Sequence, residues 1–440
     1  MILKRAWRAT LVAGVVCSAG LAASAAAAAS ATPAWGTTTS APAGTLADLF
    51  GVAASSSSDV VAVGGYNPGE FPTALLTRPY AEHWNGSRWA ATTVPLASVY
   101  SGQAAQLNGV AEVAAGDGWA VGTVSDPSSL ASKTLAYHWN GAAWQRDSTP
   151  NPAGPSQGNE LAAVAARATN DVWAAGGDGG YPEASLVLHW NGSAWARVQV
   201  PSIGALDAVT VTSASLWVAG GNKVEQFNGS AWTSLPALPG SVSIAGLAHT
   251  AAGLWAVGYS SFSCGEGGTC TVSYAALWNG AAWTTVPSGG GTELSGVVAA
   301  GSAVLAAGGT GVWQLSTTAG TPQVTPTQNP PQLTAIGADP AGHPWAVGSA
   351  SSAPAIINAP GIGQGGILVD SGAANATITW TGPATGTGTT AVNGTFATGG
   401  LPDGRYTVTT GLSGCQPGVA TAKVTAGQVT PVTAKVVCPP

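Results

Sequence analysis

The chain has 440 residues, enough for one large repeat domain and a second, smaller domain, and its formal net charge is −6. Only 7% of the residues are charged, but 45% are hydrophobic and 18 are tryptophan, which excludes an intrinsically disordered chain. The sequence has no basic patch, so neither nucleic acid nor an anionic membrane surface is expected as a partner.

Residues 1–31 are typical of an export signal. Lys4, Arg5 and Arg8 form a basic start, and an alanine-rich apolar stretch follows over residues 9–29. Small residues at the end of this stretch fit a cleavage site, so we expect a secreted, extracellular protein. A retained membrane anchor is the alternative, because the stretch is almost long enough to span a bilayer. No later segment is expected to span a membrane.

Two motifs recur along residues 32–360. The first, an apolar residue followed by two small apolar residues and glycine, occurs seven times. Its copies are Val61–Gly64, Trp119–Gly122, Trp173–Gly176, Trp217–Gly220, Trp255–Gly258, Leu305–Gly308 and Trp345–Gly348. The second motif joins two aromatic residues through Asn-Gly. Its copies are Trp84–Trp89, Trp139–Trp144, Trp190–Trp195, Phe227–Trp232 and Trp278–Trp283.

Each repeat has room for four short strands. Four-stranded repeats of roughly 40–50 residues are typical of a β-propeller, in which each repeat forms one blade. Seven first motifs predict seven blades. The seventh repeat lacks an outer tryptophan strand, whereas the segment around Trp35 resembles such a strand without the rest of a repeat. We therefore expect the Trp35 strand to complete the seventh blade and close the ring.

The Asn-Gly motif predicts a tight hairpin between strands three and four of a blade, because both residues tolerate turn conformations. With a two-residue loop, Trp190 and Trp195 lie diagonally across the hairpin. With a four-residue loop they lie directly opposite each other. In both cases the two indoles share one face and are expected to pack against the next blade.

The character of the sequence changes after the repeats. Residues 361–366 are glycine-rich and are expected to be a linker, since their G-x-G-x-x-G spacing precedes a strand rather than a helix. Residues 367–440 contain alternating segments such as Ala376–Trp380, which predict a small antiparallel β-sandwich. The fold class is therefore all-β: a seven-bladed propeller closed by an N-terminal strand and followed by a sandwich.

Four cysteines remain after the signal. An even number in an exported chain predicts two disulfides, and the separation of the pairs along the chain favours Cys264–Cys270 and Cys415–Cys438. A metal site is the alternative, but no histidine lies near either pair at a ligand spacing.

Two resemblances are visible in these segments. The Gly-Gly pairs that follow the second strand, as at Gly64-Gly65 and Gly176-Gly177, resemble those of kelch-type and related secreted bacterial propellers. Residues 393–396 and 400–408 resemble the carboxypeptidase-regulatory-like, prealbumin-type sandwich, which implies an accessory module of an extracellular protein. The composition, rich in alanine, glycine and threonine, resembles that of exported actinobacterial proteins. These resemblances imply no activity.

Candidate catalytic and metal-binding groups are few. His83, His138 and His189 precede tryptophan in three consecutive repeats, which raises the possibility of zinc, but equivalent positions on neighbouring outer strands diverge, so local contacts are favoured. Asp59, Asp117 and Asp171 precede the second strand and are expected to bond backbone N–H groups at turns. No metal, cofactor or catalytic residue is predicted, and the sequence favours a non-enzyme.

The repeats differ most in the connections between their second and third strands, which share one rim of the ring. These connections are long in the first, second, third and fifth repeats. Aromatic and acidic residues there suit a sugar or peptide ligand, and ordinary loop variation is the alternative. The candidate ligand-binding residues are Tyr66, Glu70, Phe71, Asp126, Asp178, Tyr181 and Glu183.

Three functions remain open from the sequence. The first is a monomeric, non-catalytic extracellular binding or adhesion protein, directed to a glycan, the cell wall or a cell-surface protein. The second is a propeller hydrolase, lyase or oxidase acting on polysaccharide. The third is a scaffold whose sandwich contacts another protein.

Overall fold

The fold is that of a computed structural model and consists of β-strands; no helix occurs in the residues described. The all-β prediction is confirmed. The structure describes residues 36–38, 47–67, 77–86, 88–96, 99, 102–129, 131–154, 157–179, 183–264, 268–286, 288, 293–301, 303–309, 311–315, 332–350, 353–358, 365–383, 385–390, 394–401, 404–424 and 429–439. The proposed export signal and the glycine-rich residues 361–364 lie outside these ranges.

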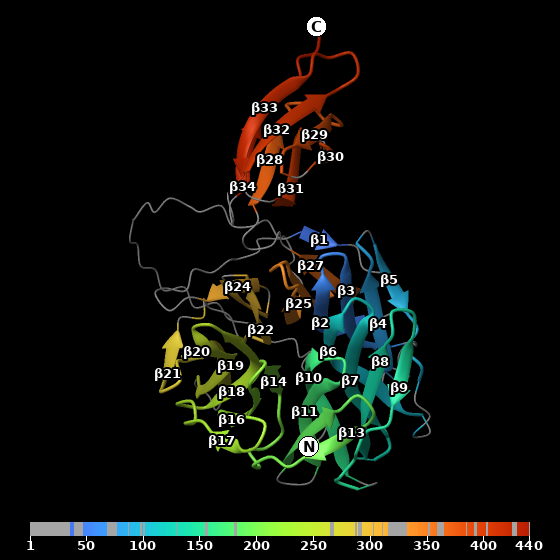
Figure 1. The fold of residues 1–440 in the computed structure, drawn as a ribbon, viewed down its shortest axis with the longest axis vertical. Coiled ribbons are helices and arrows are strands. Elements are labelled where there is room, and N and C mark those ends of the chain that lie inside the picture. The colour runs from blue at the N-terminus through green and yellow to red at the C-terminus, as the bar shows by residue number, and fades with distance from the viewer. Residues whose placement is uncertain are drawn as a thin grey trace.

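Antiparallel sheets follow one another along the repeats, and Figure 1 shows them arranged side by side around a common centre. Sheets 1 to 3 each have four strands. Sheet 1 contains β2 (Ala47–Ser56), β3 (Asp59–Tyr66), β4 (Arg78–Trp84) and β5 (Trp89–Thr92). Sheet 2 contains β6 (Ala104–Ala114), β7 (Asp117–Ser125), β8 (Ser132–Trp139) and β9 (Trp144–Asp147). Sheet 3 contains β10 (Gly158–Ala168), β11 (Asp171–Gly179), β12 (Ala184–Trp190) and β13 (Trp195–Val198).

Sheets 4 to 6 continue this order. Sheet 4 contains β14 (Ala208–Val211), β15 (Leu216–Gly220), β16 (Lys223–Phe227) and β17 (Trp232–Ser234). Sheet 5 contains β18 (Val242–Thr250), β19 (Gly253–Ser263), β20 (Thr269–Trp278) and β21 (Trp283–Val286). In the described part of sheet 6 there are three strands, β22 (Gly296–Ala300), β23 (Ala303–Gly308) and β24 (Gly311–Leu315).

Sheet 7 combines strands from distant parts of the repeats. It contains β25 (Gln332–Ala338), β26 (Pro344–Ala350) and β27 (Ala353–Asn358), and β1 (Gly36–Thr38) occupies its outer edge. Gly36 pairs with Asn358 and Thr38 with Ile356 in antiparallel register. Trp35 itself lies outside the described residues.

Each sheet buries its faces against its neighbours. Trp119 of sheet 2 packs against Trp190 and Trp195 of sheet 3, with ring centroids 4.7 and 5.1 Å away. Sheets 7 and 1 share a core in the same way, where Trp345 lies 5.8 Å from Trp84 and 5.7 Å from Trp89. Aromatic contacts of this kind contribute about 0.5–1.5 kcal/mol beyond the burial of apolar surface.

The Asn-Gly hairpin has the four-residue form. Trp190 pairs directly with Trp195. The Asn191 side chain accepts hydrogen bonds from the N–H groups of Ser193 at 3.0 Å and Ala194 at 3.1 Å, and Gly192 has a φ of 93°. The two indoles share a face, as expected. However, they pack against the preceding sheet, since Trp119 belongs to sheet 2, and not against the next one.

The glycine that ends the first motif is required by a close backbone approach. A Cβ atom at any of the seven positions would lie 1.7–2.2 Å from a carbonyl oxygen of the innermost strand or its lead-in segment. At Gly176 the distance to the Glu160 oxygen would be 2.0 Å. The carbonyl of Gly176 accepts a hydrogen bond from the N–H of Leu206 in sheet 4 at 3.0 Å, and Gly258 and Leu294 repeat this link at 3.1 Å. The missing Cβ atom therefore lets the second strand lie close to the innermost segment of its own sheet.

Residues 365–439 form two further sheets around one apolar core. The first sheet contains β28 (Gly365–Asp370), β31 (Thr395–Leu401) and β34 (Val429–Thr433). The second contains β29 (Thr377–Thr381), β30 (Gly386–Thr389), β32 (Gly404–Gly411) and β33 (Gly418–Val424). Ile367 of β28, Ile378 of β29 and Tyr406 of β32 meet in the core between them. Gly365 and Gly366, assigned to the linker from the sequence, are the first residues of β28, because they pair with neighbouring strands.

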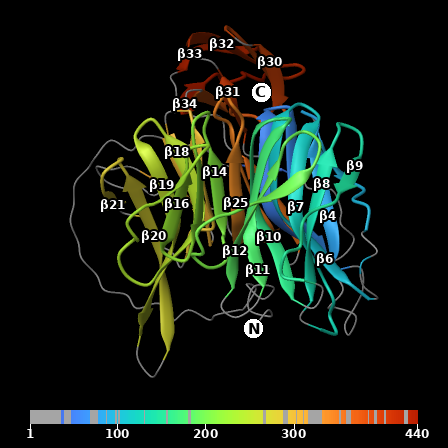
Figure 2. The ribbon, with the colours of Figure 1, turned by 60° about the horizontal axis from the view of Figure 1, so that its bottom comes forward.

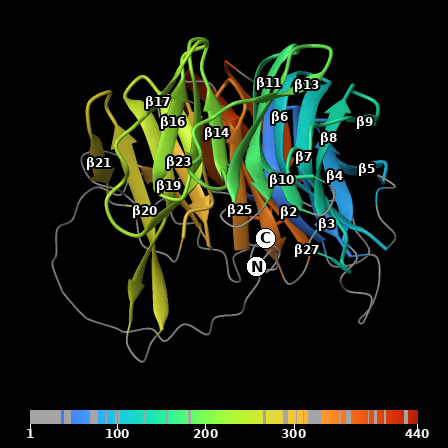
Figure 3. The same ribbon diagram turned by 90° about the horizontal axis from the view of Figure 1, so that it is seen from below.

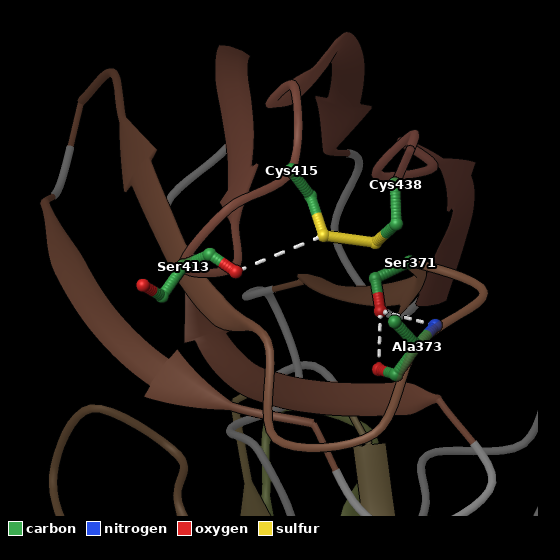
Figure 4. The surroundings of a disulfide bond; sticks show 5 residues. All are labelled: Ser371, Ala373, Ser413, Cys415 and Cys438. Atoms are coloured by element: carbon green, nitrogen blue, oxygen red, sulfur yellow. Dashed lines mark hydrogen bonds between the residues drawn. A yellow bond between two sulfur atoms is a disulfide. The ribbon is translucent and has the colours of Figure 1, made fainter. Parts of the chain in front are cut away.

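Both predicted disulfides are confirmed. Cys264 and Cys270 join the two ends of the β19–β20 loop, six residues apart. Cys415 and Cys438 join the loop after β32 to the end of the chain across 23 residues (Figure 4). By the loop-closure argument, a bond over such a distance stabilises a small domain by about 3 kcal/mol. Among the described residues, no helix is long and apolar enough to cross a membrane.

The backbone approach at the motif glycine predicts a large difference between two neighbouring substitutions. Gly64→Ala places a Cβ atom 1.9 Å from the Asp48 oxygen and should lower the free energy of unfolding by about 3 kcal/mol or more. Gly65→Ala is the matched control, since the nearest atom to its Cβ atom would be the Gln106 Cβ atom at 3.3 Å. Thermal and denaturant unfolding of both variants measure the difference, and equal losses would contradict the proposed role of Gly64.

Candidate functional site

The sheets end at two rims. At the loop rim, the second strand of each sheet continues into the third, as in the β3–β4, β7–β8, β11–β12 and β19–β20 connections. At the turn rim, the first strand turns into the second, and the Asn-Gly hairpins lie there as well. The predicted ligand-binding residues belong to the loop rim. Tyr66, Asp126, Asp178 and Glu183 are described, whereas Glu70, Phe71 and Tyr181 lie outside the described residues.

Two of the four described candidates belong to sheet 3 and contact that sheet. The Asp178 carboxylate forms an ion pair with Arg197 of β13, with 2.7 Å between the oxygen and Nη2. Glu183 lies over Gly177, where a Cβ atom would be 2.6 Å from its Oε1. The Asp178 carboxylate thus neutralises an arginine of the same sheet.

The other two candidates lie in sheets 1 and 2. Tyr66 packs edge-on against Tyr80, with ring centroids 5.9 Å apart. Asp126 closes its own turn by accepting hydrogen bonds from Ser128 N at 2.9 Å and Ser128 Oγ at 2.6 Å. The hydrogen bonds from Ser128 hold the pKa of Asp126 below its usual range. The described candidates thus share a rim, but each is held within its own sheet.

A repeated acid–histidine pair lies at the turn rim. Asp59 and His83, Asp117 and His138, and Asp171 and His189 pair within sheets 1, 2 and 3. The distances between the carboxylate Oδ1 and the histidine Nε2 are 2.5, 2.7 and 2.9 Å. Each histidine therefore contacts the aspartate of its own sheet. Sequence reasoning placed these residues in separate roles.

The pairing could have been found from strand register. Trp173, two residues after Asp171, pairs with His189, so the aspartate and histidine share one face of the sheet. Sheets 1 and 2 repeat this register. The tryptophan also stacks on the histidine, with centroids 4.1 Å apart in sheet 3. Among the described residues, no three histidine, cysteine or acidic side chains are grouped to hold a metal ion.

The same aspartates connect neighbouring sheets. Asp59 accepts a hydrogen bond from Gly116 N of sheet 2 at 3.3 Å, and Asp117 accepts one from Thr169 Oγ1 of sheet 3 at 2.7 Å. In sheet 3 the link passes through Arg167, which bonds both Asp171, at 3.0 Å, and the carbonyl of Thr212.

Two of these aspartates show what the pairs do chemically. Burial raises the pKa of Asp171, but the hydrogen bonds from Arg167, His189 and Trp173 outweigh it, so the pKa lies below its usual range. In sheet 1 the Ser55 hydroxyl donates to Asp59 and not to His83, so the histidine does not activate it as a nucleophile. The pairs therefore act as structural contacts.

Glu112 of β6 lies beside the Asp59 pair. Its Oε2 accepts the N–H of Ser55 at 2.7 Å, and its Oε1 is buried without a hydrogen-bond partner. Burial raises the pKa of Glu112 to about 9, and the charge of Asp59 contributes in the same direction, against a smaller opposite effect of the Ser55 N–H. Glu112 is therefore protonated at neutral pH in the folded chain.

The raised pKa of Glu112 predicts a pH-dependent stability. Because the folded chain keeps this proton up to about pH 9, whereas the unfolded chain releases it near pH 4.5, stability falls as the pH rises across this window. Glu112→Gln removes the ionisation, so its melting temperature should exceed that of the unmodified protein by a few degrees at pH 9 and by little at pH 4.

Calorimetry between pH 4 and pH 9 measures this difference. Asp126→Asn is the control. Because the pKa of Asp126 is lowered, its ionisation changes the stability only at acidic pH. A constant difference between Glu112→Gln and the unmodified protein across this range would contradict the buried, protonated state.

No family model matches the chain, and no curated protein matches it. Several solved structures do. A streptogramin B lyase structure shares 12% identity at a TM-score of 0.50, covering 74% of this chain and 96% of the other. Selenomethionine-substituted virginiamycin B lyase from Staphylococcus aureus shares 11% identity at a TM-score of 0.47, with coverages of 70% and 94%. YCF48 bound to D1 peptide shares 14% identity at a TM-score of 0.44, with coverages of 75% and 99%.

These solved structures are β-propeller-like proteins. At 12% identity, the match to the streptogramin B lyase structure concerns the fold and carries no statement about activity. It agrees with the order of antiparallel sheets in residues 36–358, each packed against the next. The chain therefore has an all-β, β-propeller-like fold.

Proposed function

We propose that this chain is an exported, non-catalytic extracellular binding or adhesion protein, directed to carbohydrate or the cell wall, and that the loop rim is its binding surface. The single observation that carries this proposal is the β19–β20 hairpin. It projects beyond the other strands (Figure 2), is closed by a disulfide, and exposes Phe262 by 50% and Val272 by 41%. Exposed apolar side chains on a braced projection favour contact with a partner.

The proposed architecture is a closed, kelch-like propeller of seven blades with an accessory sandwich. Three contacts support closure: β1 pairs with β27, Trp345 packs with Trp84 and Trp89, and the Thr334 hydroxyl donates to the Leu49 carbonyl. The two sheets of residues 365–439, which share one core, support the sandwich. A closed ring would be a rigid scaffold for the connections at its rim, as a binding surface requires.

The contacts of the acidic groups support a binding role over catalysis. Asp178 is paired with Arg197, Asp126 bonds its own turn, and at the turn rim Asp59, Asp117 and Asp171 are each paired with a histidine. General acid–base catalysis needs a titratable group within reach of a substrate, and these groups already hold strands together.

The proposal is tested by binding of the protein to a glycan array and to isolated cell-wall preparations. Two variants shorten the connections at residues 67–77 and 179–184, and Phe262→Ser alters the hairpin. We expect at least tenfold weaker binding for one or more of them. Val437→Ser is the control, because Val437 is 66% exposed in the other unit of the chain.

Two outcomes would contradict the proposal. Binding that is unchanged in all the loop-rim variants would show that this rim is not the binding surface. Release of sugar fragments or of oxidised products from the same preparations would favour a polysaccharide-active hydrolase, lyase or oxidase instead.

A further inference from the structure

The outer half of the β19–β20 hairpin is a two-stranded ribbon, and within the part of the chain that the structure describes no strand pairs with its β20 side. The two strands pair without a bulge from Leu254 and Trp278 outward to Ser263 and Thr269. β21 pairs only with Ala275–Trp278, so it stops short of the ribbon. Figure 3 shows the ribbon extending past the ends of the other strands.

The hydrogen-bond pattern fixes which backbone groups of β20 point outward. Ser261 donates its N–H to the Ser241 carbonyl at 2.9 Å, on the side away from β20. Ser261 pairs with Thr271, so this is a pair without mutual hydrogen bonds. Cys264 N donates to the Gly268 carbonyl at 3.1 Å. Cys264 and Gly268 are therefore a hydrogen-bonded pair, and the pairs alternate along the ribbon between those with and those without mutual hydrogen bonds. The N–H and C=O groups of Thr271 and Thr269 therefore point away from β19, toward the outer edge.

The outer edge of β20 is hydrogen-bonded near β21, and farther out no described strand pairs with it. The Ser288 hydroxyl donates to the Ser273 carbonyl at 2.9 Å, which satisfies the last outward carbonyl near β21. Among the described residues, no strand pairs with the outer edge of Thr269–Val272. Proteins commonly protect such an edge with a lysine, a proline or a bulge, and Thr269–Ser273 contains none of them.

The two faces of the ribbon differ in chemistry. Phe262 pairs with Cys270 and therefore shares a face with Val272 and Tyr274, since alternate residues of a strand point to the same side. The opposite face carries hydroxyl side chains from Ser261, Ser263, Thr269 and Thr271. A strand added at the edge would extend one apolar face and one polar face.

We propose that the outer edge of Thr269–Val272 binds an extended segment of another polypeptide as an added β-strand. The inference rests on the proposed binding role and specifies a partner for one part of the same rim. Outward groups at Thr269 and Thr271 are separated by one strand repeat of roughly 7 Å, which matches the main chain of a strand. The segment is expected to alternate β-branched apolar residues, on the Phe262 face, with threonine or serine.

The probe is a fluorescently labelled, end-capped pentapeptide of alternating valine and threonine. Its controls are the same peptide with every second amide N-methylated, which removes strand donors, and a chitin oligosaccharide. Binding is measured by fluorescence anisotropy for the peptides and by calorimetry for the sugar. We expect binding of the unmethylated peptide and at least tenfold weaker binding of the methylated one.

Two variants at one position separate the backbone from the side chain. Thr271→Pro removes an outward N–H group that makes no bond to β19, and proline is tolerated at strand edges. It should weaken peptide binding at least tenfold with an unchanged melting temperature. Thr271→Val keeps the N–H group and should bind as the unmodified protein does. Phe262→Ser tests the apolar face and should weaken binding of the valine peptide.

Several results would overturn the inference. They are no peptide binding by the unmodified protein, equal binding by Thr271→Pro, and a preference for the sugar. Self-association that depends on Thr271, seen by sedimentation, would show that the edge binds a second copy instead. If the protein binds cell wall or glycan but does not bind the peptide, only this inference is contradicted. If both fail, the proposed binding function is lost as well.

Discussion

The packing of tryptophans between neighbouring sheets holds the repeat domain together. A four-stranded sheet with both faces apolar is not stable alone, and here each face is buried by a neighbour. The indole of Trp119 fills the space beside Trp190 and Trp195, and Trp345 does the same beside Trp84 and Trp89. Two other indole N–H groups bond across the sheets: Trp232 donates to the Gln199 carbonyl and Trp283 to the Pro236 carbonyl. The side chains that fill the interface therefore also set its alignment.

Charge has a secondary role in the same interfaces. With so few ionisable groups, the chain places several of them where neighbouring sheets meet at the turn rim. Asp59 and Asp117 each join a histidine of their own sheet to the turn of the following sheet. The protonated Glu112 shows the limit of this arrangement, because burial and the negative charge of Asp59 both disfavour a second carboxylate there. The loop rim, by contrast, is where the repeats differ from one another.

Much of this fold was predictable because each repeat restates the same physical requirements. The motif glycines, the Asn-Gly turns and the cysteine pairs each depend on local geometry, so short patterns sufficed for the strands and the disulfides. The direction in which Trp190 packs was not predictable, because it depends on the twist of the sheet. The Asp171–His189 pair was missed because it requires strand register. At the candidate site, the partner of Asp178 is Arg197, and the sequence alone does not bring those two residues together.

The three-residue strand β1 has a consequence for the order of folding. Gly36 pairs with Asn358, so the contact that completes sheet 7 joins residues more than 300 positions apart. Closing such a long loop costs conformational entropy. The pairing of β1 offsets this entropy only after the intervening sheets have formed and brought the two ends close together. The first strand of the described residues, β1, is then among the last to dock. Until it docks, the edge of β27 is open, and the folding chain is most vulnerable to aggregation and proteolysis in that interval.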